Sequence, residues 1–295
     1  MLRKFFPEEY IALLSAFVII AVQIYCIFTG IISDVSVIIF PVISIVIMGV
    51  MCLSPLSMWR GAGGEASRFL RSWLQIPFYG IIFTAFQSFV HKLNPKDYDW
   101  LLLRADYSVF GFDITVWFEQ YISKVFTEVL TLSYFSYYVL PTLTFVVLFF
   151  GKDKAAFINA RKYLLAIIIG WYGAFIFYLI LPAAGPDITY PEHYKVPLVG
   201  LSPITNTYLQ NLGEYLKGSF VRNTYPSMHF GIILMTNYFA HKFTKKYFWL
   251  CTLPLGTLLG IATLYLRQHY LIDLVGSFFI AGLSIYFSLQ YFKSK

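Results

Sequence analysis

Residues 10–30 read YIALLSAFVIIAVQIYCIFTG, a run without a single charged side chain. An α-helix needs about 20 consecutive apolar residues to cross the hydrocarbon core of a bilayer. Across the chain 58% of residues are hydrophobic and only 13% are charged, against about 25% charged in a soluble domain. The run and the composition predict an all-α, polytopic membrane helix bundle. The first run is too long for a signal peptide and lacks a small-residue cleavage site, so we expect a retained helix.

Hydropathy windows predict about eight membrane-spanning helices. The segments 54–72, 92–129 and 183–225 do not span by their pattern, and the second contains Trp100 and Trp117, which are typical of the membrane interface. We expect two helices and a cytoplasmic loop in residues 1–72, followed by a bundle of six helices in residues 73–295. The predicted spans are residues 10–30, 35–54, 73–91, 130–150, 163–182, 226–243, 247–266 and 270–291.

Lysine and arginine are distributed unevenly among the loops. If the N-terminus lies in the cytoplasm and the helices alternate, 14 of the 22 Lys and Arg residues fall on the cytoplasmic side and 8 on the other. Short loops rich in Lys and Arg stay in the cytoplasm, so we expect both termini there. The formal net charge of +7 therefore indicates membrane topology, and not a nucleic-acid partner, because the basic residues are scattered among loops.

Two polar stretches interrupt the apolar pattern at the starts of predicted helices. Residues 222–229 read RNTYPSMH, and residues 267–273 read RQHYLID. The predicted topology places both stretches, and the loop 183–225, on the non-cytoplasmic face. An ionisable residue at membrane depth costs about 2.5–3.5 kcal/mol on insertion scales, so it needs a partner or a task. The polar stretches therefore predict a functional site on that face.

The second stretch contains a histidine and a carboxylate four residues apart, His269 and Asp273. At this spacing two side chains share one face of a helix. The carboxylate can accept a hydrogen from one imidazole nitrogen and leave the other nitrogen free as a nucleophile. The alternative is a helix-surface hydrogen bond that only satisfies two polar side chains.

The first stretch carries groups that suit an anion. Pro226 fits the first turn of a helix, so we expect the sixth helix to begin there and its free N–H groups to form an anion site. Ser227 adds a hydroxyl, Arg222 a planar fork for phosphate oxygens, and His229 a general acid. Arg267 can contact the same phosphate or extend to lipid headgroups. Each residue also has an ordinary interpretation, as a helix cap, a loop charge or a satisfied polar group.

Two other chemistries use some of the same residues. His229, His269 and Asp273 are an acceptable ligand set for zinc, although the sequence has no HExxH motif and no cysteine on that face. A serine hydrolase would need Ser227 in a GxSxG setting. Ser227 also lies only two residues from His229, so the two would not face each other on a helix.

The two stretches resemble the second and third motifs of the type 2 phosphatidic acid phosphatase superfamily, Pro-Ser-x-His and Arg…His-x-x-x-Asp. Here they are PSMH at residues 226–229 and RQHYLID at residues 267–273. The resemblance covers about residues 99–285. It implies a helical membrane bundle and a phosphohistidine mechanism without metal or cofactor. In it His269 is the nucleophile, Asp273 its orienting partner, His229 the acid on the leaving group and Ser227 a phosphate contact.

The sequence departs from the common pattern of this superfamily at two places. The arginine expected about six residues before the histidine is Thr263, and the first motif, Lys-x6-Arg-Pro, is absent. Residues 181–186 read LPAAGP in its place, and Arg222 becomes our candidate for the main phosphate-binding base. Together with VFGFD at 109–113 and LSYFSYY at 132–138, this variant resembles the inositol phosphorylceramide synthase branch.

We therefore expect an integral membrane enzyme that acts on a phospholipid or another lipid phosphate, as a phosphatase or a phosphotransferase. The branch resemblance favours transfer of a phospho-headgroup to a ceramide-like lipid. A lipid transporter or flippase without covalent chemistry is the main alternative, since transport paths also contain ionisable residues. However, the polar residues gather at one face and no inverted repeat is visible. A structural membrane subunit is a third possibility.

Overall fold

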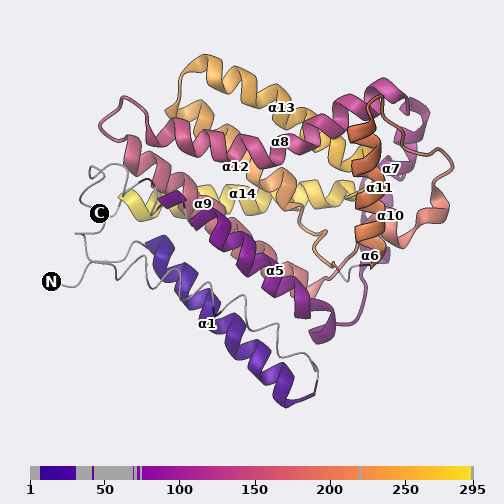
Figure 1. Cartoon of the computed structure of the whole chain (residues 1–295), viewed down its shortest axis with the longest axis horizontal. Coiled ribbons are helices and arrows are strands. Elements are labelled where there is room, and N and C mark those ends of the chain that lie inside the picture. Colours follow the sequence, from indigo (N-terminus) through magenta and orange to yellow (C-terminus); the bar gives the residue numbers. More distant parts are fainter. Residues whose placement is uncertain are drawn as a thin grey trace. The chain divides into compact units, whose positions relative to one another are not determined.

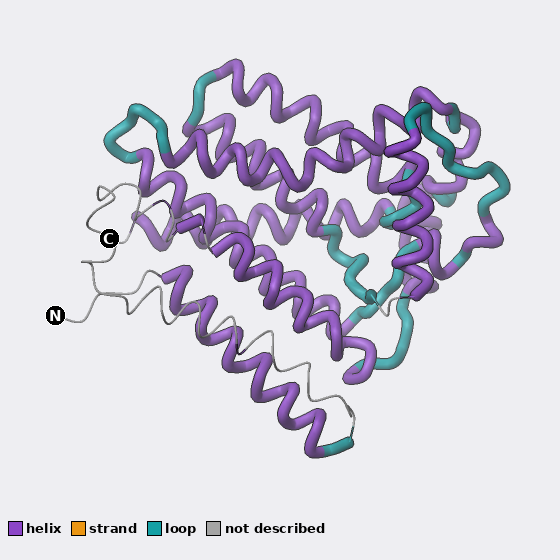
Figure 2. Tube along the Cα trace, viewed as in Figure 1, coloured by secondary structure: helices purple, strands orange, loops and turns teal. Residues whose placement is uncertain are grey.

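The computed structural model describes residues 7–30, 42, 69, 72–73, 75–218 and 221–293. The chain divides into two compact units, residues 1–95 and 96–295. The described residues form helices and the loops between them, and none of these residues is in a strand (Figure 2). The prediction of an all-α membrane helix bundle is confirmed.

The first unit contains two long helices that pack against each other, α1 (Pro7–Phe28) and α5 (Gln75–Leu93). They agree with the predicted spans 10–30 and 73–91. Of the predicted span 35–54 only residue 42 is described, and most of the predicted loop 54–72 also lies outside the described residues. The expected division of the chain at residue 72 stays a prediction.

The second unit is built around five long helices that pack against one another (Figure 1). Four of them, α8, α9, α13 and α14, are long and apolar enough to cross a membrane. The fifth, α12, has 16 residues, fewer than the roughly 20 that span a bilayer core. The five helices are α8 (Lys124–Phe149), α9 (Ala156–Ile180), α12 (Met228–Phe243), α13 (Lys246–Tyr265) and α14 (Leu271–Lys293).

Three of these helices begin two or more residues from the position that the hydropathy pattern predicts. Charged residues lie in the first two turns of both α8 and α9, so a window that measures only hydropathy starts these helices at 130 and 163 instead of Lys124 and Ala156. Pro226 was expected in the first turn of the sixth helix, and this is wrong. The helix, α12, begins at Met228, and Ser227 is its N-cap, with Oγ accepting a hydrogen bond from the backbone N–H of Phe230.

Short helices gather at the end of the bundle where α12 and α14 begin (Figure 1). They come from the two long segments that the sequence predicted not to span the membrane. No short helix among them is identified as a candidate span. They are α6 (Asp99–Phe110), α7 (Ile114–Trp117), η2 (Phe118–Tyr121), α10 (Pro186–Thr189), η3 (Pro191–His193) and α11 (Pro203–Gly218).

Two buried carboxylates of α6 fix this end of the bundle. Asp106 accepts hydrogen bonds from the backbone N–H groups of Leu271 and Ile272, at 2.8 and 2.7 Å, and so caps the start of α14 from another helix. Asp99 accepts from the N–H groups of residues 184 and 185, at 2.9 and 2.8 Å, and from the hydroxyl of Tyr270 at 2.9 Å. Helix α6 therefore joins the turn after α9 to the segment that carries His269.

The turn after α9 also contacts the segment before α14 directly. Gly185 has a φ of +103°, and a Cβ atom at this position would lie 2.8 Å from the carbonyl oxygen of Gln268. The backbone N–H of Asp187 donates to the carbonyl of Arg267 at 3.1 Å. Glycine is required here because both the positive φ and the close backbone approach exclude a side chain.

Candidate active site

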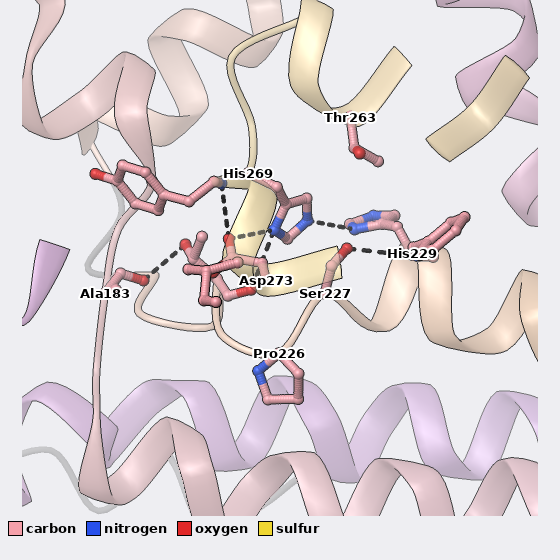
Figure 3. Close-up of polar contacts among 12 residues, drawn as sticks. Ala183, Pro226, Ser227, His229, Thr263, His269 and Asp273 are labelled. Atoms are coloured by element: carbon pink, nitrogen blue, oxygen red, sulfur yellow. Dashed lines mark hydrogen bonds and ion pairs between the residues drawn. The ribbon is translucent and has the colours of Figure 1, made fainter. Parts of the chain in front are cut away.

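Three predicted site residues meet in a line of hydrogen bonds where α12 and α14 begin (Figure 3). His229 lies in the first turn of α12, Asp273 in the first turn of α14, and His269 in the segment before α14. Nδ1 of His229 lies 3.3 Å from Nε2 of His269, and Nδ1 of His269 lies 3.2 Å from Oδ2 of Asp273. The structure thus brings together side chains that are 40 residues apart in the sequence.

The surroundings of His269 determine which of its nitrogens is free to react. Its Nδ1 also lies 3.1 Å from the carbonyl oxygen of Thr224. A carbonyl oxygen can only accept a hydrogen bond, so Nδ1 carries the hydrogen and Nε2 carries the lone pair. Burial lowers the pKa of the His269 imidazole, and the neighbouring His229 lowers it further. A neutral imidazole with a bare Nε2 is the form that a nucleophile requires.

Asp273 is completely buried and held from two sides. Its Oδ2 also accepts from the backbone N–H of Tyr270 at 2.9 Å, and its carbonyl oxygen accepts from the backbone N–H of Ser227 at 3.2 Å. Ser277 donates its hydroxyl hydrogen to this carbonyl and to that of Ser227, at 2.8 and 2.6 Å. These bonds join the start of α12 to the start of α14, so the backbone segments that carry the two histidines are held next to each other.

The two arginines of the polar stretches each bond a carboxylate. Arg222 forms an ion pair with Asp97. Arg267 is 6% exposed, donates from Nη2 to Oε1 of Glu119 at 3.1 Å, and lies over the ring of Tyr194 at 4.0 Å. Neither arginine has a hydrogen bond to the histidines among those described, and their predicted role as phosphate contacts stays a prediction.

Thr263 occupies the position at which the resembled superfamily has its arginine. Its hydroxyl donates to the carbonyl of Gly260 at 2.7 Å, and it is fully buried. Its own carbonyl accepts from the N–H groups of Gln268 and His269, at 3.0 and 3.2 Å. At this position the chain therefore has a residue that shapes the backbone before His269 and carries no charge.

Several residues that hold the site were not predicted as site residues, although two of them, Tyr134 and Tyr137, lie in the LSYFSYY stretch. The hydroxyl of Tyr134 lies 3.0 Å from Nε2 of His229, and the ring of Tyr137 lies 4.5 Å from the His229 ring. Asp99 and Asp106 were also missed. Two carboxylates seven residues apart, on one face of a helix in an apolar segment, were the signal that could have found them.

The zinc alternative receives no support from the arrangement of the three side chains. Both nitrogens of His269 are hydrogen-bonded to other groups, Nδ1 to Asp273 and Nε2 to His229. In the described part of the chain no three His, Cys, Asp or Glu side chains form a group that could hold a metal ion.

Comparison with known proteins identifies the class. The profile of the PAP2 superfamily matches residues 101–287, so the chain belongs to this superfamily. A PA-phosphatase related-family protein of Dictyostelium discoideum is 25% identical over 176 residues, which cover 54% of this chain and 31% of the relative. The chain therefore matches less than a third of that protein's length. No solved structure matches the chain. The superfamily indicates a lipid phosphatase or phosphotransferase; the inositol phosphorylceramide synthase branch stays a prediction.

Proposed function

We propose that the protein is a lipid phosphatase or phosphotransferase that works through a phosphohistidine at His269. The observation that supports this best is the line of hydrogen bonds from His229 through His269 to Asp273. It supplies an imidazole with one oriented nitrogen and one bare nitrogen, next to a second imidazole that can exchange protons. Membership of the PAP2 superfamily supports a lipid phosphate as the substrate.

In the first half of the reaction, Nε2 of His269 attacks the phosphorus of the lipid phosphate. The N–P bond forms while the P–O bond to the lipid alcohol breaks, and the protonated form of His229 gives a proton to the departing oxygen. Asp273 and the carbonyl of Thr224 hold the Nδ1–H of His269 and stabilise the positive charge that develops on its ring.

In the second half, an acceptor hydroxyl attacks the same phosphorus. His229 takes the hydroxyl proton, the N–P bond breaks, and His269 returns with its lone pair on Nε2. Water as the acceptor gives a phosphatase, and an alcohol gives a phosphotransferase. The resemblance of LSYFSYY and VFGFD to the inositol phosphorylceramide synthase branch favours transfer of a phospho-headgroup to a ceramide-like lipid.

The two imidazoles have to separate before a substrate can react. An attacking nitrogen lies about 3–3.5 Å from the reacting atom, and an acid about 2.6–3.2 Å from the leaving oxygen. A phosphoryl group cannot fit between two nitrogens that are 3.3 Å apart. The hydrogen bond between His229 and His269 thus closes the site, and the phosphate replaces this bond when it binds.

The side of the membrane follows from the loop charges. If both termini lie in the cytoplasm, as the loop charges predict, the histidines lie on the non-cytoplasmic face, where a lipid headgroup of that leaflet reaches them. A lipid flippase remains the alternative function, and it differs in one respect: it forms no covalent intermediate with its lipid.

Trapping of the intermediate separates the two functions. Purified protein is incubated with phosphatidic acid, with a prenyl diphosphate, or with phosphatidylinositol and ceramide. Mass spectrometry then identifies free phosphate or a new phospholipid, and the denatured protein is tested for an acid-labile phosphohistidine. We expect His269→Ala to abolish both the phosphohistidine and the product. His241 is an exposed histidine in the last turn of α12, and we expect the control His241→Ala to keep both. Full turnover by His269→Ala would refute the proposal.

A further inference from the structure

The line of hydrogen bonds through the two histidines continues to a tyrosine of α8. From Asp273 and Thr224 it passes through His269 and His229, and it ends at the hydroxyl of Tyr134, 3.0 Å from Nε2 of His229. Tyr134 lies 95 residues before His229 in the sequence and is 4% exposed. Its ring packs at a centroid distance of 5.0 Å from the ring of His229.

The carbonyl of Thr224 determines the position of every hydrogen in this line. Because the carbonyl only accepts, Nδ1 of His269 donates and its Nε2 is bare. A bare Nε2 accepts, so the hydrogen between the two rings belongs to Nδ1 of His229. A neutral His229 then has a bare Nε2, and the hydroxyl of Tyr134 has to be the donor there. The neutral line therefore has a single consistent arrangement of hydrogens.

We propose that Tyr134 is a positioning residue that holds His229 in its reactive orientation through each of its protonation states. This inference rests on the proposed function, in which His229 gives and takes protons on its Nδ1 side. In the resting line Nε2 of His229 accepts from the tyrosine. When His229 is the acid, and again after it has lost its Nδ1 hydrogen, Nε2 carries a hydrogen and has to donate. A hydroxyl serves all three states because it can both donate and accept.

The setting of Tyr134 keeps its hydroxyl directed at His229. Its side chain is packed with Leu130, Tyr265 and Leu266 in one buried apolar cluster. In the described part of the chain its hydroxyl has no hydrogen-bond partner other than His229. A buried hydroxyl without a partner is costly, so the bond to His229 is the favoured position of the hydroxyl.

A direct test reads the hydrogens on His229 and needs no turnover. Protein with ¹⁵N-labelled histidine is reconstituted in lipid nanodiscs, and the His229 signals are assigned by their loss in His229→Ala. In the wild type we expect Nδ1 to be the protonated nitrogen of His229 and Nε2 to be hydrogen-bonded. In Tyr134→Phe, which keeps the ring and removes the hydroxyl, we expect the Nε2 signal to move towards that of a nitrogen without a hydrogen bond. An unchanged His229 spectrum would overturn the inference.

A kinetic test distinguishes positioning from a merely structural role. General acid catalysis contributes about 10²- to 10⁴-fold, and only to leaving groups that need a proton. We expect Tyr134→Phe to slow phosphoenzyme formation from an alkyl phosphate ester about 10- to 100-fold. In the nitrophenyl ester of the same lipid phosphate the nitrophenol leaves and needs no proton. With this ester we expect Tyr134→Phe to slow phosphoenzyme formation less than about threefold. KM for either ester should stay near the wild-type value.

The matched control is Tyr163→Phe, which removes a buried hydroxyl of the same bundle that bonds Thr236 at 2.7 Å. It should cost similar stability and slow neither ester selectively. Equal slowing of both esters by Tyr134→Phe, at the level of this control, would reduce Tyr134 to a structural role and overturn the inference. If wild-type protein forms no phosphoenzyme with any lipid phosphate, the proposed function fails, and the spectrum of His229 still decides whether Tyr134 positions it.

Discussion

Replacement of Asp106 by asparagine tests how α6 holds the start of α14. The carboxylate is 1% exposed and accepts from Leu271 and Ile272. Burial raises the pKa of Asp106 from 3.8 to about 6, against the lowering effect of the two N–H donors and with a smaller raising effect of the Asp113 carboxylate. The ionised form thus has a cost in the folded protein that it does not have in the unfolded chain.

The sign and size of the pH effect follow from this difference. Because the folded-state pKa is the higher one, the contribution of Asp106 to stability is complete below pH 3.8 and is lost as the pH rises through about 6. A difference of about two pKa units corresponds to about 3 kcal/mol. Asparagine does not ionise, and it keeps one of the two acceptor oxygens, so it loses about 1–3 kcal/mol for one unsatisfied N–H at every pH.

The free energy of unfolding of the two proteins is compared in detergent micelles at pH 5 and pH 7.5. We expect Asp106→Asn to lose less stability than the wild type between the two pH values, so that the stability difference between the two proteins shifts by about 1.4 kcal/mol in favour of Asp106→Asn at pH 7.5. Asp153→Asn, which removes an exposed carboxylate from the turn before α9, is the control for general charge effects. A difference between Asp106→Asn and wild type that is independent of pH would refute the reasoning.

Three further substitutions test the site. Asp273→Asn offers an amide where the imidazole needs an acceptor, and we expect kcat to fall about 10²- to 10⁴-fold with little change in KM, measured by release of the lipid alcohol. Gly185→Ala combines a strained φ with a clash against the Gln268 carbonyl, so we expect a loss of about 2 kcal/mol or more in the free energy of unfolding. An unchanged Tm would contradict this. Glu119→Gln weakens the ion pair of Arg267. If Arg267 binds phosphate, we expect KM for the lipid phosphate to fall about threefold. An unchanged KM would assign Arg267 a structural role.

The sequence predicts those parts of the fold that depend on neighbouring residues. The long helices follow from runs of apolar residues. The contact between His269 and Asp273 was predicted from their spacing of four, but the two do not share a helix face, because only Asp273 lies in α14 and His269 lies in the segment before it. The start of α12 was misplaced because a proline fits both the first turn of a helix and the residue before its cap. Pro226 has the second position, since Ser227 is the residue with cap geometry.

The contacts that complete the site depend on packing between distant segments. Tyr134 and His229 are 95 residues apart, and the carboxylates that bond Arg222 and Arg267 are 125 and 148 residues away. No spacing rule connects such positions, because each contact depends on how whole helices pack. The single sequence therefore predicts candidate residues for the site, but it does not predict which of their charges are paired.

The turn at residues 181–186 has no basic residue where the superfamily has its first motif, so other residues have to meet the charge of a phosphate. In this chain the N–H groups of Ala184 and Gly185 already donate to Asp99. A carboxylate at this turn repels phosphate and occupies the donors that could hold it. The donors on the segments with the histidines include the N–H groups at the start of α12 and the side chains of Arg222 and Arg267. Both arginines are paired with carboxylates, so a phosphate that binds them exchanges one anion for another. For Arg267, which is buried, the pair with Glu119 means that no bare charge is left when the substrate leaves.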